Sequence, residues 1–301
     1  MARLTGVRSR REMLREGAIA SVGAILVGSG PASLLAAATQ KSKVVLIRDK
    51  DVLTPEGQAR PEVVQSMLDA AIFELTGVKD PVAAWGRFIR AGDVVGLKSN
   101  VWAPLPTPAA VEKAIERRVL GVGVRPEDFA SDDRGVRTNP VFARTTALVN
   151  ARPLRTHFWS GVGTLIKNYI MFAERPPDYH PDGCADLGAL WHLPQVKGKT
   201  RLNVLVLLTP QFHGVGPHAF SREYVWSYYG LAVGTDPVAV DSVGLKILEA
   251  KRREYFREER PIVPRVTHIA LADSRHGLGT ADFAKIEVVK LGYDQDRLVS
   301  F

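Results

Sequence analysis

Cysteine is almost absent from this chain of 301 residues, since Cys184 is the only one. A single cysteine can form no disulfide within the chain, and it cannot supply the thiolates of an iron–sulfur cluster or of a four-cysteine zinc site. An iron–sulfur cluster held by this chain alone is therefore excluded. The cofactor stays unknown, and a divalent metal ion bound by histidine, aspartate or glutamate is the kind that the composition leaves open.

Long apolar runs, basic stripes and the common site motifs are missing as well. After residue 38 no run of about 18 apolar residues occurs, which predicts that the mature form does not span a membrane. The basic residues are scattered and are not interleaved with aromatic residues, which argues against a nucleic-acid partner. Neither a G-x4-G-K-[ST] loop nor an H-E-x-x-H motif is present. With a nucleic-acid partner disfavoured, small anionic molecules remain as candidate partners.

The first residues have the pattern of an export signal. Ser9-Arg10-Arg11-Glu12-Met13-Leu14-Arg15 resembles the twin-arginine signal S-R-R-x-F-L-K, and a mild apolar stretch follows it. Ala36-Ala37-Ala38 then offers the small side chains that signal peptidase prefers. We predict a twin-arginine signal peptide over 1–38 and a mature domain over 39–301, exported by the twin-arginine machinery to the periplasm or secreted. The chain would be anchored to the membrane if the signal stays uncleaved, and a basic amphipathic helix is the alternative interpretation.

Strand and helix patterns alternate along the mature chain. Apolar, β-branched runs predict strands over 43–48 and 93–98, and helical spacing that begins with proline predicts helices over 61–77 and 107–120. Further predicted strands cover 147–150, 202–208, 230–233 and 286–289, and further helices cover 165–172, 186–190 and 236–258. The charged segment 130–140 and the proline-rich segment 172–182 are predicted loops. This alternation predicts one compact α/β domain, with an open, largely parallel or mixed sheet and helices on both faces.

Polar residues at predicted strand ends are the first candidates for a site, because ligands of open α/β sheets bind beyond the carboxyl ends of strands. Lys98 and Asn100 follow the second strand and could hold a phosphate or carboxylate, or be a solvated lysine and a turn-forming asparagine. Gly161-Val162-Gly163 leads into a predicted helix whose first amides could face an anion. Lys167 and Asn168 fall near the first turn of that helix.

Histidines and aspartates in the second half of the chain are the candidates for acid–base or metal chemistry. His157, His180, His213 and His218 lie in predicted loops or strand ends, where a converging set would suit a transition metal although no tight spacing supports one. Asp236 precedes a proline, which is typical of a helix N-cap. Asp241 lies in an apolar helix start, where a carboxylate needs a cation, a metal ion or a hydroxyl group as partner.

Taken in order over about residues 43 to 292, these segments resemble the domain-of-unknown-function 362 family. The segments that carry the resemblance are Asn150–His157, Ser160–Val162, Ile166–Asn168, His180, Ala185–Leu187 and Gly234–Asp241. Arg155 stands where that family usually has lysine, an aspartate usual after the strand ending at Thr209 is missing, and so are the cysteine clusters of some members. The resemblance implies an α/β fold and a polar site, but no particular reaction.

The predicted site gathers these polar residues at one side of the sheet. The predicted catalytic residues are His157, Lys167 and His180, the predicted substrate-binding residues are Lys98, Asn100, Arg155 and Asn168, and the predicted metal ligands are His157, His180, Asp186, Asp236 and Asp241. The first hypothesis is an exported enzyme, metal-dependent or redox-associated, that acts on a small anionic substrate. The alternative is a non-catalytic periplasmic protein that binds a metal or an anion, and a third is a purely structural polar network.

Overall fold

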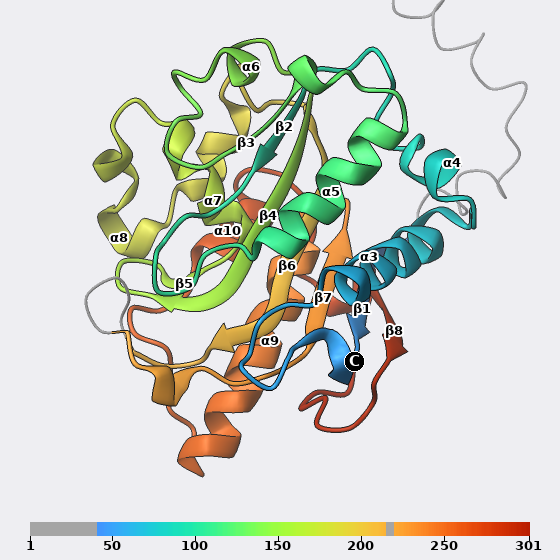
Figure 1. Cartoon of the computed structure of the whole chain (residues 1–301). Coiled ribbons are helices and arrows are strands. Elements are labelled where there is room, and N and C mark those ends of the chain that lie inside the picture. Colours follow the sequence, from blue (N-terminus) through green and yellow to red (C-terminus); the bar gives the residue numbers. More distant parts are fainter. Residues whose placement is uncertain (1–40, 215–219) are drawn as a thin grey trace, which may run out of the picture. The chain divides into compact units, whose positions relative to one another are not determined.

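One mixed sheet of eight strands organises the chain, in the order β3-β2-β4-β6-β7-β1-β8, with β5 paired to β4 (Figure 1). The computed structural model describes residues 41–214 and 220–301, so the predicted signal peptide and His218 lie outside the described residues. Ser42–Phe301 form one structural unit. The strands are β1 (Ser42–Arg48), β2 (Val95–Lys98), β3 (Phe129–Asp132), β4 (Ala147–His157), β5 (Gly161–Gly163), β6 (Thr200–Gln211), β7 (Gly230–Gly234) and β8 (Ile286–Gly292).

Strand direction decides which polar residues can meet. β7 is antiparallel to both of its neighbours, β6 and β1, whereas β3, β2, β4 and β6 are mutually parallel and β1 is parallel to β8. The parallel strands therefore end at one edge of the sheet, which we call the carboxyl edge, and β7 ends at the opposite, amino edge. Lys98 at the end of β2 and His157 at the end of β4 share the carboxyl edge. Asp236, which follows β7, does not.

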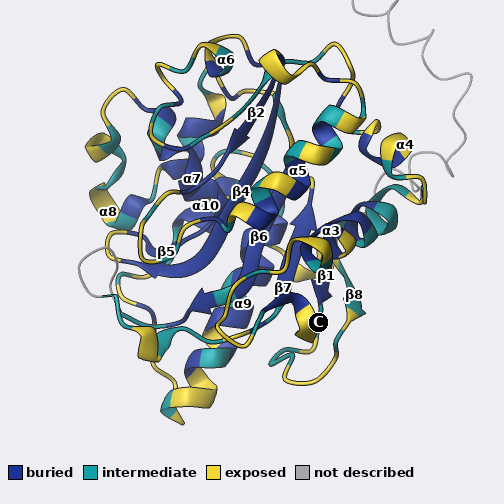
Figure 2. Ribbon diagram, in the orientation of Figure 1, coloured by how far each residue is buried: buried dark blue, intermediate teal, exposed yellow. Residues whose placement is uncertain are grey.

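Helices cover both faces of the sheet, and the buried residues form one apolar cluster on each face (Figure 2). Alternate residues of each strand point to opposite faces, so Val44 and Leu46 join one cluster while Val45 and Ile47 join the other. One face is packed by α3 (Pro61–Thr76), α4 (Pro81–Trp85) and α5 (Ala109–Gly121). The other face is packed by α6 (Pro140–Ala143), α7 (Leu165–Asn168), α9 (Pro237–Phe256) and α10 (His268–Ser274), and α8 (Pro181–Cys184) contributes Cys184 to it. The predicted α/β class is confirmed.

Local sequence signals explain where the main helices begin and end. α3 begins at Pro61 and ends at Gly77, whose φ of 70° is readily adopted by glycine. α9 begins at Pro237, and the Asp236 carboxylate accepts hydrogen bonds from the next two backbone N–H groups, as its N-cap role predicts. No helix in the described part of the chain is long and apolar enough to cross a membrane.

The sequence interpretation differs from the structure in several places, and the short elements α4, α6, α8 and β5 were not predicted. Residues 129–132 form β3 at the edge of the sheet, within a region predicted to begin a loop at 130. The predicted helix over 165–172 is a short α7 followed by a 3-10 turn, and 187–192 is also 3-10 in character. α10 was not predicted, because seven residues carry too little periodicity to reveal a helix.

Candidate functional site

Four cationic side chains lie buried around the carboxyl ends of β2 and β4 and in α7. Lys98, Arg152, Arg155 and Lys167, which we call the cationic layer, are 0%, 3%, 4% and 2% exposed. Burial, together with the charge of Arg152, lowers the pKa of the other three members. Charged side chains this deeply buried normally have opposite charges beside them.

Lys98 is the member of the layer that has such a partner. Its Nζ lies 2.5 Å from Oδ1 of Asp133, the residue that follows β3, and 2.8 Å from the Ser99 carbonyl oxygen. The backbone N–H of Val101 donates to the other Asp133 oxygen at 2.9 Å. Asn168 Oδ1 lies 3.4 Å from the amine and completes three acceptors around it. Lys98 is thus held as an ammonium ion that ties β2 to the end of β3.

Arg152 and Arg155 form no ion pair with any described residue, and each keeps a buried Nε without a hydrogen-bond partner. Burial lowers the pKa of Arg152 to about 10, although Asp133 and Asp241 are near enough to oppose this shift. Burial followed by the charge of Arg152 lowers the pKa of Arg155. The Arg155 guanidinium lies 4.1 Å from the ring centre of Trp102. A Cβ on Gly163 would come within 2.8 Å of an Arg152 terminal nitrogen, so glycine in β5 lets this guanidinium lie against the backbone.

Three asparagines hold the centre of the site in place. Asn168 Nδ2 lies within hydrogen-bond distance of the Asn150 side-chain oxygen, at 2.8 Å, and of two backbone carbonyls. Asn150 in turn donates to the Leu165 carbonyl at 3.0 Å, and Asn203 donates to the Thr235 carbonyl at 3.1 Å. The side-chain amides of these asparagines thus form hydrogen bonds within the protein itself. Asn168, a predicted substrate-binding residue, therefore positions α7 against β4.

Lys167 lies among the histidines of the site. Its single side-chain hydrogen-bond partner in the described chain is the Cys184 thiol, with Nζ 3.5 Å from Sγ. Burial and then the charge of Lys167 lower the pKa of His157, of His180 and of His268. The structure thus brings together the three predicted catalytic residues, His157, Lys167 and His180.

The histidines are held in different ways. His157 Nδ1 accepts the backbone N–H of Trp159 at 3.2 Å, so its proton resides on Nε2 when the ring is neutral. The half-buried His180 ring stacks on Trp159, with ring centres 4.1 Å apart. His268 is completely buried, and neither of its ring nitrogens has a partner. Its pKa falls to about 3, so the ring is neutral and offers one free lone pair.

The Asp241 side chain accepts hydrogen bonds at the start of α7. Its carboxylate accepts Thr164 Oγ1 at 2.6 Å and the backbone N–H groups of Leu165 and Ile166 at 2.9 Å each. Burial raises the pKa of Asp241 to about 7, against the effect of these hydrogen bonds. The expectation that the first amides of this helix face a bound anion is wrong, because the chain's own carboxylate occupies them.

The five predicted metal ligands are not gathered at one point, although His157 and His180 lie near each other. Asp236 lies at the amino edge, where it also accepts Ser42 Oγ at 2.6 Å, and Asp186 is an exposed residue that lies 2.8 Å from His276 Nε2. Among the described residues no group of three or more histidine, cysteine, aspartate or glutamate side chains is arranged to hold a metal ion. Asn100, a predicted substrate-binding residue, is buried beside Lys98 with its side-chain oxygen unpartnered.

Four members of the site escaped the sequence analysis: Asp133, Arg152, Cys184 and His268. Asp133 was assigned to a loop, and only the pairing of β3 with β2 brings it to Lys98. Arg152 had a usable signal, because a cation in the middle of a run of buried strand residues needs a reason to be there. His268 had no signal, since it follows an irregular segment far from the other residues in sequence.

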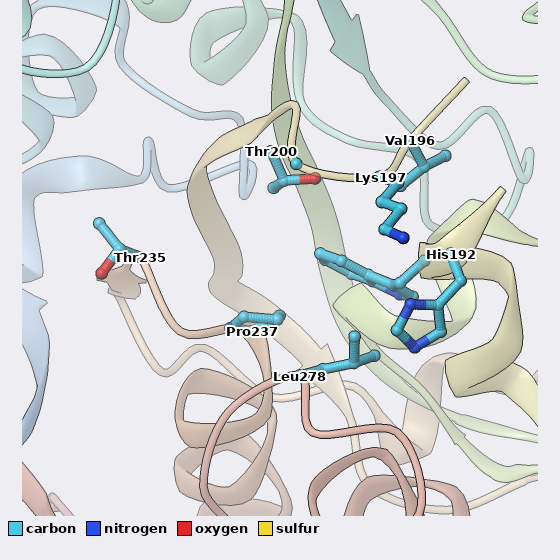
Figure 3. Close-up of a pocket in the computed structure, with 9 residues that line it drawn as sticks. His192, Val196, Lys197, Thr200, Thr235, Pro237 and Leu278 are labelled. Atoms are coloured by element: carbon cyan, nitrogen blue, oxygen red, sulfur yellow. The ribbon is translucent and has the colours of Figure 1, made fainter. Parts of the chain in front are cut away.

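A separate cavity of about 360 Å³ lies at the amino edge (Figure 3). Its wall includes Trp191, His192, Lys197, Thr200 and Thr235. Figure 3 shows Lys197 and His192 on one side of the cavity and Thr235 on the other. None of the predicted site residues lines it, so the cavity and the cationic layer are distinct features.

Comparison with protein-family models, with curated proteins and with solved structures finds no match to this chain. The function must therefore be argued from the site itself.

Proposed function

We propose that the chain is an exported enzyme that binds a small anionic substrate, a carboxylate or a phosphate, in the cationic layer at the carboxyl edge. The observation that carries this proposal is the pair of buried guanidinium groups, Arg152 and Arg155, which have no ion-pair partner among the described residues. A buried charge without a partner is strongly unfavourable. A bound anion would supply the missing charge.

The chemistry of the layer supports an oxygen-bearing anion. A guanidinium presents a planar set of donors that matches a carboxylate or phosphate, and such charge-assisted hydrogen bonds are strong. Both unpartnered Nε atoms are donors of this kind. Lys98 is already committed to Asp133, so the two arginines and Lys167 are the groups that an anion would contact.

Turnover is supported by the side chains that surround Lys167. A simple binding site needs only cations and amides, whereas this one also contains His157 with a proton on Nε2 and His268 with a free lone pair. Neutral imidazoles can donate and accept hydrogen bonds at a reacting group without adding to the local positive charge. This combination favours an enzyme over the non-catalytic binding protein.

An anion should stabilise the folded chain, and this stabilisation should depend on Arg155. Acetate or phosphate at about 100 times its dissociation constant is expected to add about 2.7 kcal/mol to the free energy of unfolding, measured by thermal or urea denaturation. Arg155→Met should abolish the gain without lowering the stability of the anion-free protein, because it removes a buried unpaired charge.

Arg175→Met is the matched control, since the Arg175 side chain is 78% exposed and far less costly to leave unpaired. It should keep the full anion effect. Equal stabilisation of the Arg155→Met protein by anions would contradict the proposal.

Export depends on a segment outside the described residues. Arg10→Lys combined with Arg11→Lys is expected to leave the full-length chain in the cytoplasm, because the twin-arginine machinery recognises the arginine pair. Cell fractionation and immunoblotting measure the distribution. Arg8→Lys, outside the pair, should leave export unchanged, and normal export of the double variant would refute the signal.

A further inference from the structure

The two buried lysines of the cationic layer differ in what surrounds their amines. Burial lowers the pKa of both to about 8, so geometry must distinguish them. Lys98 Nζ has three oxygen acceptors, which match the three N–H bonds of an ammonium ion. Lys167 Nζ has one partner, a thiol at 3.5 Å, and no carboxylate within ion-pair distance among the described residues.

The surroundings of Lys167 make its neutral amine more available than that of an exposed lysine, because burial lowers its pKa to about 8. Arg152 and Arg155 lie close enough to lower its pKa further, and burial raises the pKa of the Cys184 thiol, which therefore stays protonated and uncharged. A thiol is a weak acceptor and gives little stabilisation to an ammonium ion. A neutral lysine amine, desolvated and beside other cations, is the form that attacks carbonyl groups.

The same neighbours define what kind of molecule would reach this amine. The unpartnered guanidinium groups of Arg152 and Arg155 suit a carboxylate, and the amine beside them suits an electrophilic carbon attached to it. A 2-oxo carboxylate carries both groups on adjacent atoms. Neither phosphate nor a simple carboxylate offers an electrophilic carbon to the Lys167 amine.

We propose that Lys167 forms an imine with the ketone of a small 2-oxo carboxylate whose carboxylate is held by Arg152 and Arg155. This inference rests on the proposed anion site. The Lys167 Nζ lone pair forms a bond to the carbonyl carbon, and the π electrons of the C=O bond move to its oxygen, which takes up a proton. Loss of water then gives the C=N bond, so one amine and one ketone yield one imine and one water molecule.

The histidines near Lys167 can hold the reacting groups by hydrogen bonds. His157 can donate a hydrogen bond from Nε2 to the carbonyl oxygen, and His268 keeps an unpartnered ring nitrogen near the amine. The proton that the nitrogen loses after attack is the one that the oxygen takes up. Lys98 cannot replace Lys167, because its three acceptors, with Asp133 among them, hold it in the protonated form.

Borohydride trapping tests the inference on the folded chain. The protein is incubated with pyruvate or 2-oxoglutarate and sodium borohydride, and intact-mass measurement with peptide mapping locates the reduced adduct. We expect one adduct per chain at Lys167, at least about tenfold above any exposed lysine. Acetate, which has the carboxylate but no ketone, should compete with pyruvate and form no adduct.

Two lysine variants provide matched comparisons. Lys167→Arg removes the nucleophilic amine and should lose the adduct at this position. Lys197→Arg, at the separate amino-edge cavity, should keep the adduct. The peptide map of the unsubstituted protein decides the question by itself if the Lys167→Arg protein does not fold.

The outcomes separate this inference from the proposed function. If acetate stabilises the protein while no adduct forms at Lys167, or while labelling is spread over exposed lysines, imine formation would be overturned. Either result would still support the anion site. If no anion stabilises the protein and no adduct forms, both the anion site and the imine are refuted.

Discussion

Replacing Asp133 by asparagine is expected to destabilise the folded chain by about 3 kcal/mol, because it leaves the completely buried Lys98 ammonium without a counter-charge. Asparagine keeps the shape and one acceptor oxygen, so the loss reports mainly on charge. The Val101 backbone N–H, which donates to the second Asp133 oxygen, can also lose its acceptor. Urea unfolding of the variant and the parent protein measures the difference.

A surface ion pair and a double variant show whether burial is the cause. Asp178→Asn removes the carboxylate that pairs with Arg175 at the surface, and should change the stability by less than about 0.5 kcal/mol. Lys98→Met combined with Asp133→Leu removes both buried charges and should be more stable than Asp133→Asn alone. A change of under about 1 kcal/mol for Asp133→Asn would show that Lys98 is not held as a buried ammonium ion.

Replacing Asp241 by alanine is expected to destabilise the chain by about 4 kcal/mol and to abolish anion binding. The substitution leaves three buried donors, from Thr164, Leu165 and Ile166, without an acceptor, and each such loss is worth about 1–3 kcal/mol. These residues begin α7, which carries Lys167 and Asn168 into the site. Thermal unfolding with and without acetate measures both effects.

Asp186→Ala is the control for Asp241→Ala. The Asp186 side chain is 55% exposed and lies outside the cationic layer, so its removal should change the stability by about 0.5 kcal/mol or less and leave anion binding intact. Full anion binding by the Asp241→Ala protein would show that the position of α7 does not depend on this carboxylate.

Sequence patterns predicted the framework of the site but not its pairing. Lys98 was predicted from its place after a strand, His157 as a histidine in a predicted loop or strand end, and Lys167 from the glycine turn before its helix. Arg155 was predicted from the resemblance to a family motif. The pairing of Lys98 with Asp133 joins residues 35 apart, through a strand that was taken for a loop. No pattern of local spacing could have shown that contact.

Asp236 shows the opposite case, in which a prominent motif proved to be structural. Its position before Pro237 was sufficient to predict a helix N-cap, and the structure confirms that role. Its place in a shared site depended on the direction of β7. Because β7 runs antiparallel to its neighbours, the residue after it lies at the edge of the sheet opposite to His157.

The sequence by itself determined the α/β class, the positions of the main strands and helices, and the absence of any cluster that needs several thiolates. These properties follow from periodicity, capping residues and composition, which act over a few neighbouring positions. Only the tertiary structure decided which charges are paired, since strand order and direction bring Asp133 to Lys98 and leave Arg152 and Arg155 without an ion pair among the described residues. The unpaired cations define the candidate site, and they arise from contacts between segments that lie far apart in the chain.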